Sequence, residues 1–200
     1  MLLTLIRHGQ STYNLENRFT GDTDIPLTAL GKEEALQAGK KIKDIIYDVA
    51  YTSILKRAEE TLQIILKEIN QEQIPVIKNT ALDERRYGDL QGMNKAETAT
   101  KYGDSQVLIW RRSYDVRPPG GESLEDTYKR VIPYYKLEIK PWLLAGKNVL
   151  VVAHGNSLRA LMMYLENISK EAIVKVNIPT GIPRQYTFDN KLKLTEVNYL

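Results

Sequence analysis

The sequence predicts an α/β fold, a three-layer sandwich in which helices flank a mostly parallel central sheet. Short apolar runs alternate with amphipathic helical patterns along most of its 200 residues. Two runs, 2–6 and 148–153, are apolar at all but one position each, which is typical of strands buried on both faces of a parallel sheet. The length suits one ordinary hydrophobic core, so we expect a single domain over residues 1–200.

The other elements of the first half follow from local signals. Thr28 is placed to cap a helix over 29–46, and Ser53 to cap a helix over 54–69. Further strands are expected at 48–52, 75–77, 185–189 and 192–200, the last two alternating like edge strands around a turn at Asp189-Asn190.

The second half contains three more helical patterns. Ser123, with Asp126 three residues later, resembles a capping box for a helix over 124–144. Pro133 lies inside that pattern and should kink the helix or mark its true start. A helix is expected over 157–165, and Ser169 is placed to cap another short one.

A long polar segment, residues 79–121, separates the two halves. It is rich in Arg, Lys, Tyr and Gly, holds one short helical pattern at 94–102, and ends at Pro118-Pro119-Gly120-Gly121. Structureless loops beyond roughly 12–15 residues are uncommon within compact domains. We therefore interpret this segment as an insertion that builds or covers a site.

Composition narrows the class of function. The net charge is +3, the pI is about 8.9, and the 28 basic residues are spread along the chain and do not form a nucleic-acid-binding arm. This mild positive excess suits a small anionic substrate as well as a larger one. The chain has no cysteine, which excludes disulfides, thiolate catalysis and cysteine-based zinc sites. It shows no signal peptide and no apolar run near the roughly 20 residues that span a bilayer, so we expect a cytoplasmic protein.

The two histidines occupy matching positions. His8-Gly9 and His154-Gly155 each end a predicted buried strand, and ligands of open parallel sheets bind at such carboxyl ends. If the strands are neighbours, the imidazoles face each other across one pocket. A glycine after each histidine allows a sharp turn and close approach of a ligand. The helix after His154 would point free N–H groups at an anion.

Two histidines without cysteine disfavour a zinc site, which needs three or four ligands. A neutral imidazole can instead attack phosphorus and form a phosphohistidine. Phosphoryl transfer also needs positive charge around the phosphoryl oxygens, which Arg7 and a protonated His154 would supply. The alternative is that one histidine is an ordinary core residue, which the matched pair disfavours.

LIRHGQSTYN is similar to the signature of the histidine phosphatase superfamily. NLENRFTGDTDIPLTALG, LDERRYGDLQGMNKAETATKYG, VLIWRRSYDVRPP and VLVVAHGNSLRALMMYLENIS follow in order. From Leu2 to about Asp189 the chain resembles the 2,3-bisphosphoglycerate-dependent phosphoglycerate mutase family, in a short form. The resemblance implies that the protein interconverts 2- and 3-phosphoglycerate in glycolysis and gluconeogenesis through a phosphohistidine. It implies priming by 2,3-bisphosphoglycerate, no metal, no nucleic acid or membrane partner, and a homodimer.

The same resemblance implies roles for individual residues. His8 corresponds to the phosphorylated histidine, His154 to the histidine that stabilises the phosphoryl group in transfer, and Arg7 and Arg57 to the arginines of the phosphate pocket. Glu84 corresponds to the general acid and base, a choice that composition alone leaves open against Asp83 and Asp89. The implied substrate-binding residues are Ser11, Asn14, Thr20, Gly21, Tyr87, Lys95, Arg111, Arg112, Gly155 and Asn156.

The chain departs from longer family members in two places. Pro118 to Ser123 joins directly to the next helix where those members carry a further segment, and the chain ends at Leu200 where many continue into a tail. A more open site would lose more phosphoryl groups to water. The alternative function is therefore a histidine-type phosphatase acting on small phosphate esters. A catalytically silent binding domain is disfavoured, because all five expected catalytic residues are present.

Overall fold

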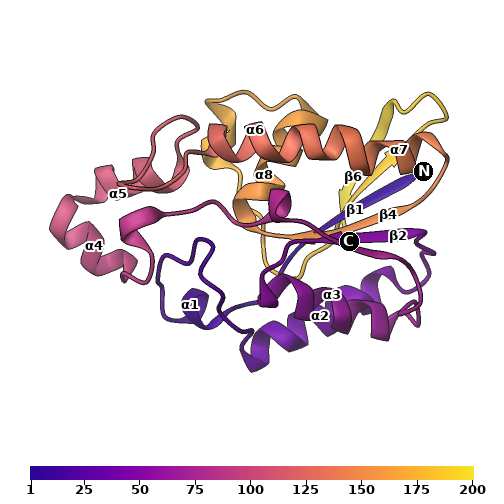
Figure 1. The fold of residues 1–200 in the computed structure, drawn as a ribbon, viewed down its shortest axis with the longest axis horizontal. Helices are drawn as coiled ribbons and strands as arrows, with labels where there is room; N and C mark the ends of the chain where they lie inside the picture. Colours follow the sequence, from indigo (N-terminus) through magenta and orange to yellow (C-terminus); the bar gives the residue numbers. More distant parts are fainter.

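A six-stranded sheet forms the centre of the computed structural model, which describes residues 1–200 (Figure 1). The strand order is β3-β2-β4-β1-β5-β6. Strands β1 (Leu2–Arg7), β4 (Val149–Ala153), β2 (Val49–Thr52) and β3 (Val76–Lys78) run parallel to one another. Strand β5 (Arg184–Phe188) runs antiparallel to both of its neighbours, β1 and β6 (Leu194–Tyr199). The predicted mostly parallel sheet is confirmed. The prediction that both C-terminal strands are edges is wrong for β5, which pairs with β1 on one side and β6 on the other.

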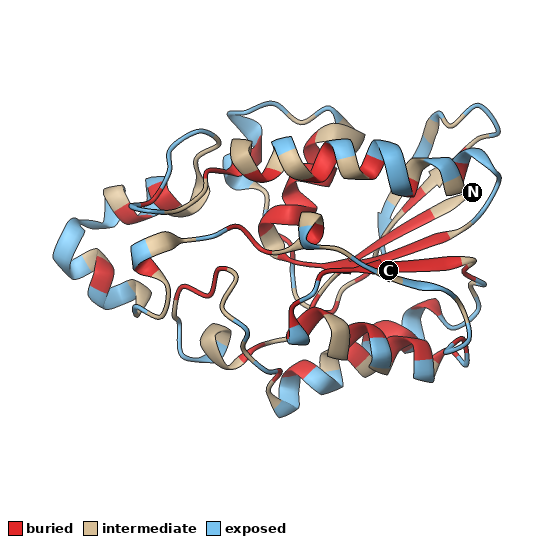
Figure 2. Ribbon diagram, viewed as in Figure 1, coloured by how far each residue is buried: buried red, intermediate tan, exposed pale blue.

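Helices cover both faces of the sheet, as predicted (Figure 1). Helices α6 (Leu124–Tyr134), α7 (Lys140–Leu144) and α8 (Gly155–Glu166) lie on one face, and α2 (Ala29–Ile42) and α3 (Lys56–Glu68) lie on the other. Alternate side chains of β4 enter separate apolar clusters, Val149 and Val151 in one, Leu150 and Val152 in the other. The strands are consequently buried on both sides (Figure 2).

Two helix boundaries on the α2–α3 face differ from the prediction. Thr28 caps α2 by accepting a hydrogen bond from the Gly31 N–H, but the helix ends at Ile42 and not at residue 46. The Gln71 side chain binds the backbone of the following turn at residues 45 and 47, which draws that turn out of the helix. Helix α3 begins at Lys56 with Leu55 as its N-cap, and the Ser53 side chain does not cap it: the hydroxyl accepts from the Leu55 N–H and contacts a histidine.

The other face keeps the predicted capping box at Ser123 and Asp126. Pro133 neither starts nor ends a helix: it lies inside α6, and a π-helical turn, Tyr135–Ile139, leads on into α7. A wider turn of this kind accommodates a helix that lacks one N–H donor. Helix α8 begins at Gly155, two residues before the predicted start. Ser169 accepts a hydrogen bond from the Ala172 N–H, but the N-cap of the short 3-10 helix Ala172–Lys175 is Glu171 and not Ser169.

Three helices gather beyond the carboxyl ends of the parallel strands, at the left of Figure 1. Helix α1 (Thr12–Leu15) follows β1, whereas α4 (Lys95–Tyr102) and α5 (Asp104–Arg112) belong to the polar segment 79–121. The sequence patterns predicted α4 and missed α5. None of the helices combines the length and apolar character needed to cross a bilayer.

Candidate active site

The two histidines meet at one edge of the sheet, as predicted. Strands β1 and β4 are parallel neighbours, with Arg7 opposite Ala153 in the register. His8 and His154 each follow by one residue, which brings their ring centroids to 5.0 Å with an interplanar angle of 58°. Both side chains are buried, so the imidazoles face each other away from bulk water.

The surroundings of His8 determine which of its ring nitrogens carries the proton. Its Nδ1 lies 2.7 Å from the Gly9 carbonyl oxygen, which can only accept, so Nδ1 carries the hydrogen. Nε2 is then the free nitrogen, and Arg57 Nε donates to it at 3.3 Å. Burial, followed by the charges of Arg57 and Arg7, lowers the pKa of His8 well below its usual 6.5. His8 therefore presents an unprotonated Nε2 of the kind that attacks phosphorus.

Two arginines hold positive charge beside His8. Arg57, on the first turn of α3, is fully buried, and its Nη1 and Nη2 donate to the carbonyls of Thr23 and Gly21, both at 2.8 Å. Arg7 Nη1 donates to the Ile178 carbonyl at 2.8 Å. These carbonyl contacts fix both guanidinium groups without neutralising them, so their charge stays available to an anion.

His154 is held differently. The Ser53 hydroxyl lies 2.7 Å from its Nε2, while its Nδ1 is buried without a protein partner. Burial, followed by the charges of Arg57, His8 and Arg7, lowers the pKa of His154 well below 6.5. Burial and these neighbouring charges both favour the neutral ring, which argues against the protonated His154 that the sequence suggested. A neutral His154 offers an N–H donor instead.

Glu84 supplies the carboxyl group of the site. Its Oε1 accepts hydrogen bonds from the backbone N–H groups of Arg85 at 2.8 Å and Asn156 at 3.0 Å. Its Oε2 takes part in no hydrogen bond and lies beside Arg7 and Gly155. Of the three carboxyls that composition left open, only Glu84 lines the pocket; Asp83 accepts from the Ile54 N–H elsewhere.

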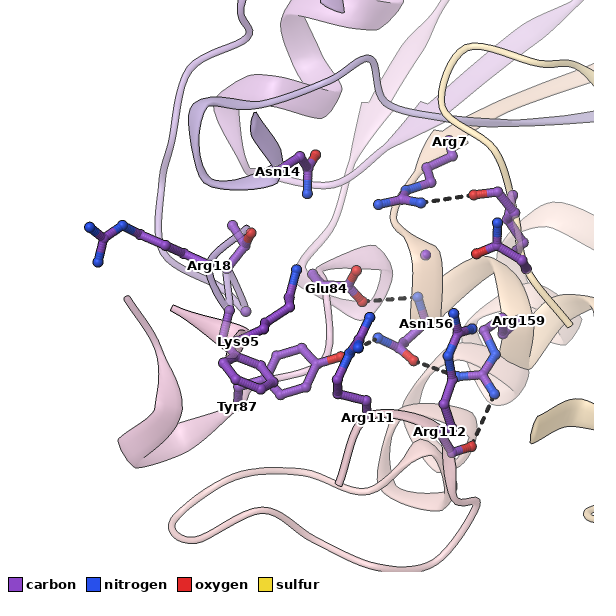
Figure 3. Close-up of a pocket in the computed structure, with 16 residues that line it drawn as sticks. Arg7, Asn14, Arg18, Glu84, Tyr87, Lys95, Arg111, Arg112, Asn156 and Arg159 are labelled. Carbon is purple, nitrogen blue, oxygen red and sulfur yellow. Dashed lines mark hydrogen bonds between the residues drawn. The ribbon is translucent and has the colours of Figure 1, made fainter. Parts of the chain in front are cut away.

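A cavity of about 150 Å³ opens in front of these groups (Figure 3). Eleven of its 16 lining residues were predicted: Arg7, Asn14, Thr20, Gly21, Glu84, Tyr87, Lys95, Arg111, Arg112, Gly155 and Asn156. His8, Arg57 and His154 are buried together behind the lining. Ser11 does not line the cavity, because its side chain caps α1 and forms a reciprocal pair with Asn14.

The charged residues that line the cavity are predominantly basic. Six basic side chains and one carboxylate line it: Arg7, Arg18, Lys95, Arg111, Arg112, Arg159 and Glu84. Burial, and next the charge of Arg111, lowers the pKa of Lys95, and the same two causes lower the pKa of Arg112. Binding of an anion reduces the electrostatic repulsion among these cations. The cavity therefore suits a small ligand with more than one negative group.

Sequence reasoning missed two buried arginines. Arg159 of α8 donates from Nη1 to Asn156 Oδ1 at 2.9 Å, and its position one helical turn after Asn156 could have revealed it. Arg85 is fully buried, donates from Nη2 to the Trp110 carbonyl at 2.8 Å, and places its guanidinium 4.5 Å from the centre of the Tyr87 ring. It thereby anchors the end of α5, where Arg111 and Arg112 lie.

The remaining lining residues that the sequence did not indicate are Arg18, Phe19, Asn177 and Ile178. Arg18 is only partly directed to the site: it donates to the Gly92 carbonyl and pairs with Glu16, and its guanidinium points away from the centre in Figure 3. No sequence pattern marks Asn177 or Ile178, which reach the cavity through the long connection before β5.

The two glycines after the histidines have different roles. A Cβ on Gly9 would lie 2.0 Å from the Gly31 carbonyl oxygen, so Gly9 is required by the contact between this turn and α2, not by a ligand. A Cβ on Gly155 would lie 3.5 Å from Glu84 Oε2 and 3.7 Å from Arg7 Nε. Only the second glycine keeps space open inside the site, which corrects half of the sequence interpretation.

Comparison with known proteins agrees with this geometry. Residues 3–196 match the family model described as histidine phosphatase superfamily, branch 1. The chain is 56% identical, over all of its length and 93% of the relative, to the 2,3-bisphosphoglycerate-dependent phosphoglycerate mutase of Cytophaga hutchinsonii. It is 58% identical to the enzyme of the same name from Rhizobium rhizogenes, covering 92% of this chain and 88% of that one. Among solved structures, mycobacterial hydrolase 1 shares the fold with a TM-score of 0.84 and 24% identity, covering 98% and 96% of the two chains.

Proposed function

The chain belongs to the histidine phosphatase superfamily, and we propose that it interconverts 2- and 3-phosphoglycerate by passing a phosphoryl group through His8. The observation that carries the proposal is one pocket with two groups of basic side chains. A histidine pair with Arg57 lies behind the lining near Arg7, and Lys95, Arg111 and Arg112 line the pocket itself. The relatives named as mutases, at more than half identity, support this activity.

A phosphoglycerate carries a phosphate and a carboxylate, which need separate partners. Arginine pairs bidentately with either group, and lysine acts as a point charge. With the phosphate at His8, the cluster of Lys95, Arg111 and Arg112 takes the other anionic end. A phosphatase for small esters needs only the first of these two subsites, which is why the second favours a mutase.

The reaction uses the fixed geometry of two groups. On the charged enzyme, the free hydroxyl of the phosphoglycerate gives a proton to Glu84 Oε2, its oxygen attacks phosphorus, and the bond from phosphorus to His8 Nε2 breaks, which leaves 2,3-bisphosphoglycerate in the pocket. In the return step His8 Nε2 gives its lone pair to the other phosphorus, the bond from that phosphorus to its ester oxygen breaks, and Glu84 gives that oxygen the proton, which leaves the isomeric phosphoglycerate and a recharged His8. One carboxyl can serve both steps because it returns the proton that it took. Arg7 and Arg57 stabilise the charge on the phosphoryl oxygens.

The proposal includes priming by 2,3-bisphosphoglycerate, which supplies the phosphoryl group that first charges His8. The lining fits such a ligand, because its basic side chains, Arg18 aside, outnumber its one carboxylate by five to one and can accept two phosphates and a carboxylate. Lys95, Arg111 and Arg112 would hold the end that does not react. The proposal also includes a metal-independent reaction in the cytoplasm, within glycolysis and gluconeogenesis, and a homodimer, which light scattering checks.

The test is a product assay with two readouts. The protein is incubated with 3-phosphoglycerate in EDTA, with and without a trace of 2,3-bisphosphoglycerate, while 2-phosphoglycerate and inorganic phosphate are followed together. We expect rapid formation of 2-phosphoglycerate that depends on the trace and ignores the chelator. His8→Ala should abolish it. Inorganic phosphate with little 2-phosphoglycerate would contradict the proposal and identify a histidine-type phosphatase.

A further inference from the structure

Ser53 lies directly behind the second histidine of the site. It follows β2, next to β4 in the sheet, and its side chain is fully buried. Its hydroxyl oxygen lies 2.7 Å from His154 Nε2 and accepts a hydrogen bond from the Leu55 N–H at 3.2 Å. No other partner of this hydroxyl exists in the structure. The contact between Ser53 and His154 is therefore compatible with two positions of the proton of neutral His154, on Nε2 or on Nδ1.

In the first arrangement the proton of neutral His154 is on Nε2. Ser53 would then accept from both Leu55 and His154, and its own hydroxyl hydrogen would be buried without an acceptor. His154 Nδ1 would then be a buried lone pair that has no protein partner. Both consequences are unfavourable, because a buried unsatisfied polar group loses its hydration without compensation.

In the second arrangement the proton is on Nδ1. The Leu55 N–H then donates to Ser53, the Ser53 hydroxyl donates to Nε2, and every group in this chain has a partner except the Nδ1–H of His154. That N–H is the one group left for a ligand. It lies on a ring whose centroid is 5.0 Å from that of His8, where a phosphoryl group would be transferred.

We propose that the Ser53 hydroxyl holds the proton of neutral His154 on Nδ1 and so aims an N–H donor at the phosphoryl group in transfer. Ser53 is thus a positioning residue, since it acts through His154 and does not touch the substrate. The two histidines carry the same tautomer for opposite purposes. A carbonyl acceptor at Gly9 frees Nε2 of His8 as nucleophile, and a hydroxyl donor at Ser53 frees Nδ1–H of His154 as donor. No proton moves along this chain during transfer.

The direct test is the tautomer of His154. The chain has only two histidines, so nitrogen NMR of protein labelled with ¹⁵N-histidine gives two imidazoles, which the variant His154→Gln assigns. We expect a protonated Nδ1 and an unprotonated Nε2 for His154 in the unsubstituted protein. In Ser53→Ala the proton should move to Nε2 or exchange between the two nitrogens, and Ser53→Thr should restore the original pattern. Ser157→Ala is the matched control, because that hydroxyl binds the backbone N–H of His154 and not its ring.

The kinetic consequence rests on the proposed transfer through His8. Removal of one hydrogen-bond donor to a developing anion slows a reaction about 100- to 1,000-fold. Ser53→Ala leaves the His154 donor in place but lets it point elsewhere, so the effect should be smaller. We expect phosphorylation of His8 to slow about 10- to 100-fold. Ser53→Thr should stay near the unsubstituted rate. A proton on Nε2 in the unsubstituted protein overturns the inference, as does an Ser53→Ala variant with unchanged tautomer. A protein that is never phosphorylated by a phosphoglycerate would refute the proposed function, and the tautomer would still decide the inference.

Discussion

Replacing Arg57 by lysine separates the geometry of a guanidinium from its charge. Arg57 is fully buried and donates three hydrogen bonds, to His8 Nε2 at 3.3 Å and to the carbonyls of Thr23 and Gly21 at 2.8 Å. Burial lowers its pKa to about 10, so it stays charged at neutral pH. A lysine at this position keeps a cation but loses the planar fork that reaches all three acceptors.

The expected loss follows from counting these bonds. A hydrogen bond from a charged donor contributes about 1.5–3 kcal/mol, and a lysine ammonium here reaches one acceptor of the three, so about 3–6 kcal/mol is lost before relaxation. The Thr23 carbonyl belongs to a half-buried residue and can recover a water partner. We therefore expect the free energy of unfolding to fall by about 3 kcal/mol, the lower end of that range. Lysine also has a lower ordinary pKa than arginine, so the same burial removes part of its charge.

The assay combines urea unfolding with single-turnover phosphorylation of His8. We expect phosphorylation of the Arg57→Lys variant to slow about 100- to 1,000-fold, because the charge on the phosphoryl oxygens in the transition state loses one oriented hydrogen-bond donor. Lys56→Ala is the matched control: its side chain is exposed and pairs with Asp24 at 3.3 Å, which is worth at most about 1 kcal/mol. If Arg57→Lys phosphorylates within about threefold of the unsubstituted rate, charge alone suffices and the geometric argument fails.

Three further predictions follow from the same site. Burial, with the neighbouring arginines, holds the pKa of His8 and His154 below 6.5. As the pH falls below about 6.5, both histidines are protonated in the unfolded chain while they stay neutral in the folded protein. The free energy of unfolding should therefore drop by up to about 2.7 kcal/mol per pH unit. Replacing both histidines by glutamine should abolish that part of the slope in urea titrations. Arg112→Ala should weaken binding of 3-phosphoglycerate far more than binding of inorganic phosphate, measured by calorimetry. Gly9→Ala should prevent folding or cost several kcal/mol, because its Cβ would lie 2.0 Å from the Gly31 carbonyl oxygen.

Each of these has a contradicting result. An unchanged pH slope after both histidines are replaced would mean that they are charged in the folded protein. Equal weakening of both ligands by Arg112→Ala would misplace the second anionic subsite. A stable, well-folded Gly9→Ala protein would show that the turn moves away from α2 at little cost.

The sheet and the histidine pair were predictable because their signals are local and strong. Almost continuously apolar runs of five or six residues require burial on both faces, and parallel neighbours place their carboxyl ends together. Helix ends were less predictable, because they depend on distant side chains. Gln71 binds residues 45 and 47 just after the end of α2, and the Ser53 hydroxyl does not cap α3 but contacts His154, 101 residues later.

The residues of the site likewise fall into those that the sequence predicted and those that it did not. Residues next to a recognisable motif, such as Glu84 and Asn156, line the pocket where the sequence placed them. Arg85 and Arg159 were missed because buried arginines are rare and sequence gives them no periodic signal. Their hydrogen bonds to backbone carbonyls and to Asn156 make burial tolerable, and those partners come together only in the fold.

The central claim is that His8 carries the phosphoryl group between two phosphoglycerates, and a pulse and chase tests it most directly. The protein is charged with 2,3-bisphosphoglycerate that is labelled in its phosphoryl groups, freed of excess ligand, and mixed with unlabelled 3-phosphoglycerate. We predict an acid-labile label that is absent from His8→Ala and that 3-phosphoglycerate rapidly converts into labelled organic phosphate. Release of the label as inorganic phosphate, at a rate that 3-phosphoglycerate does not change, would contradict the claim.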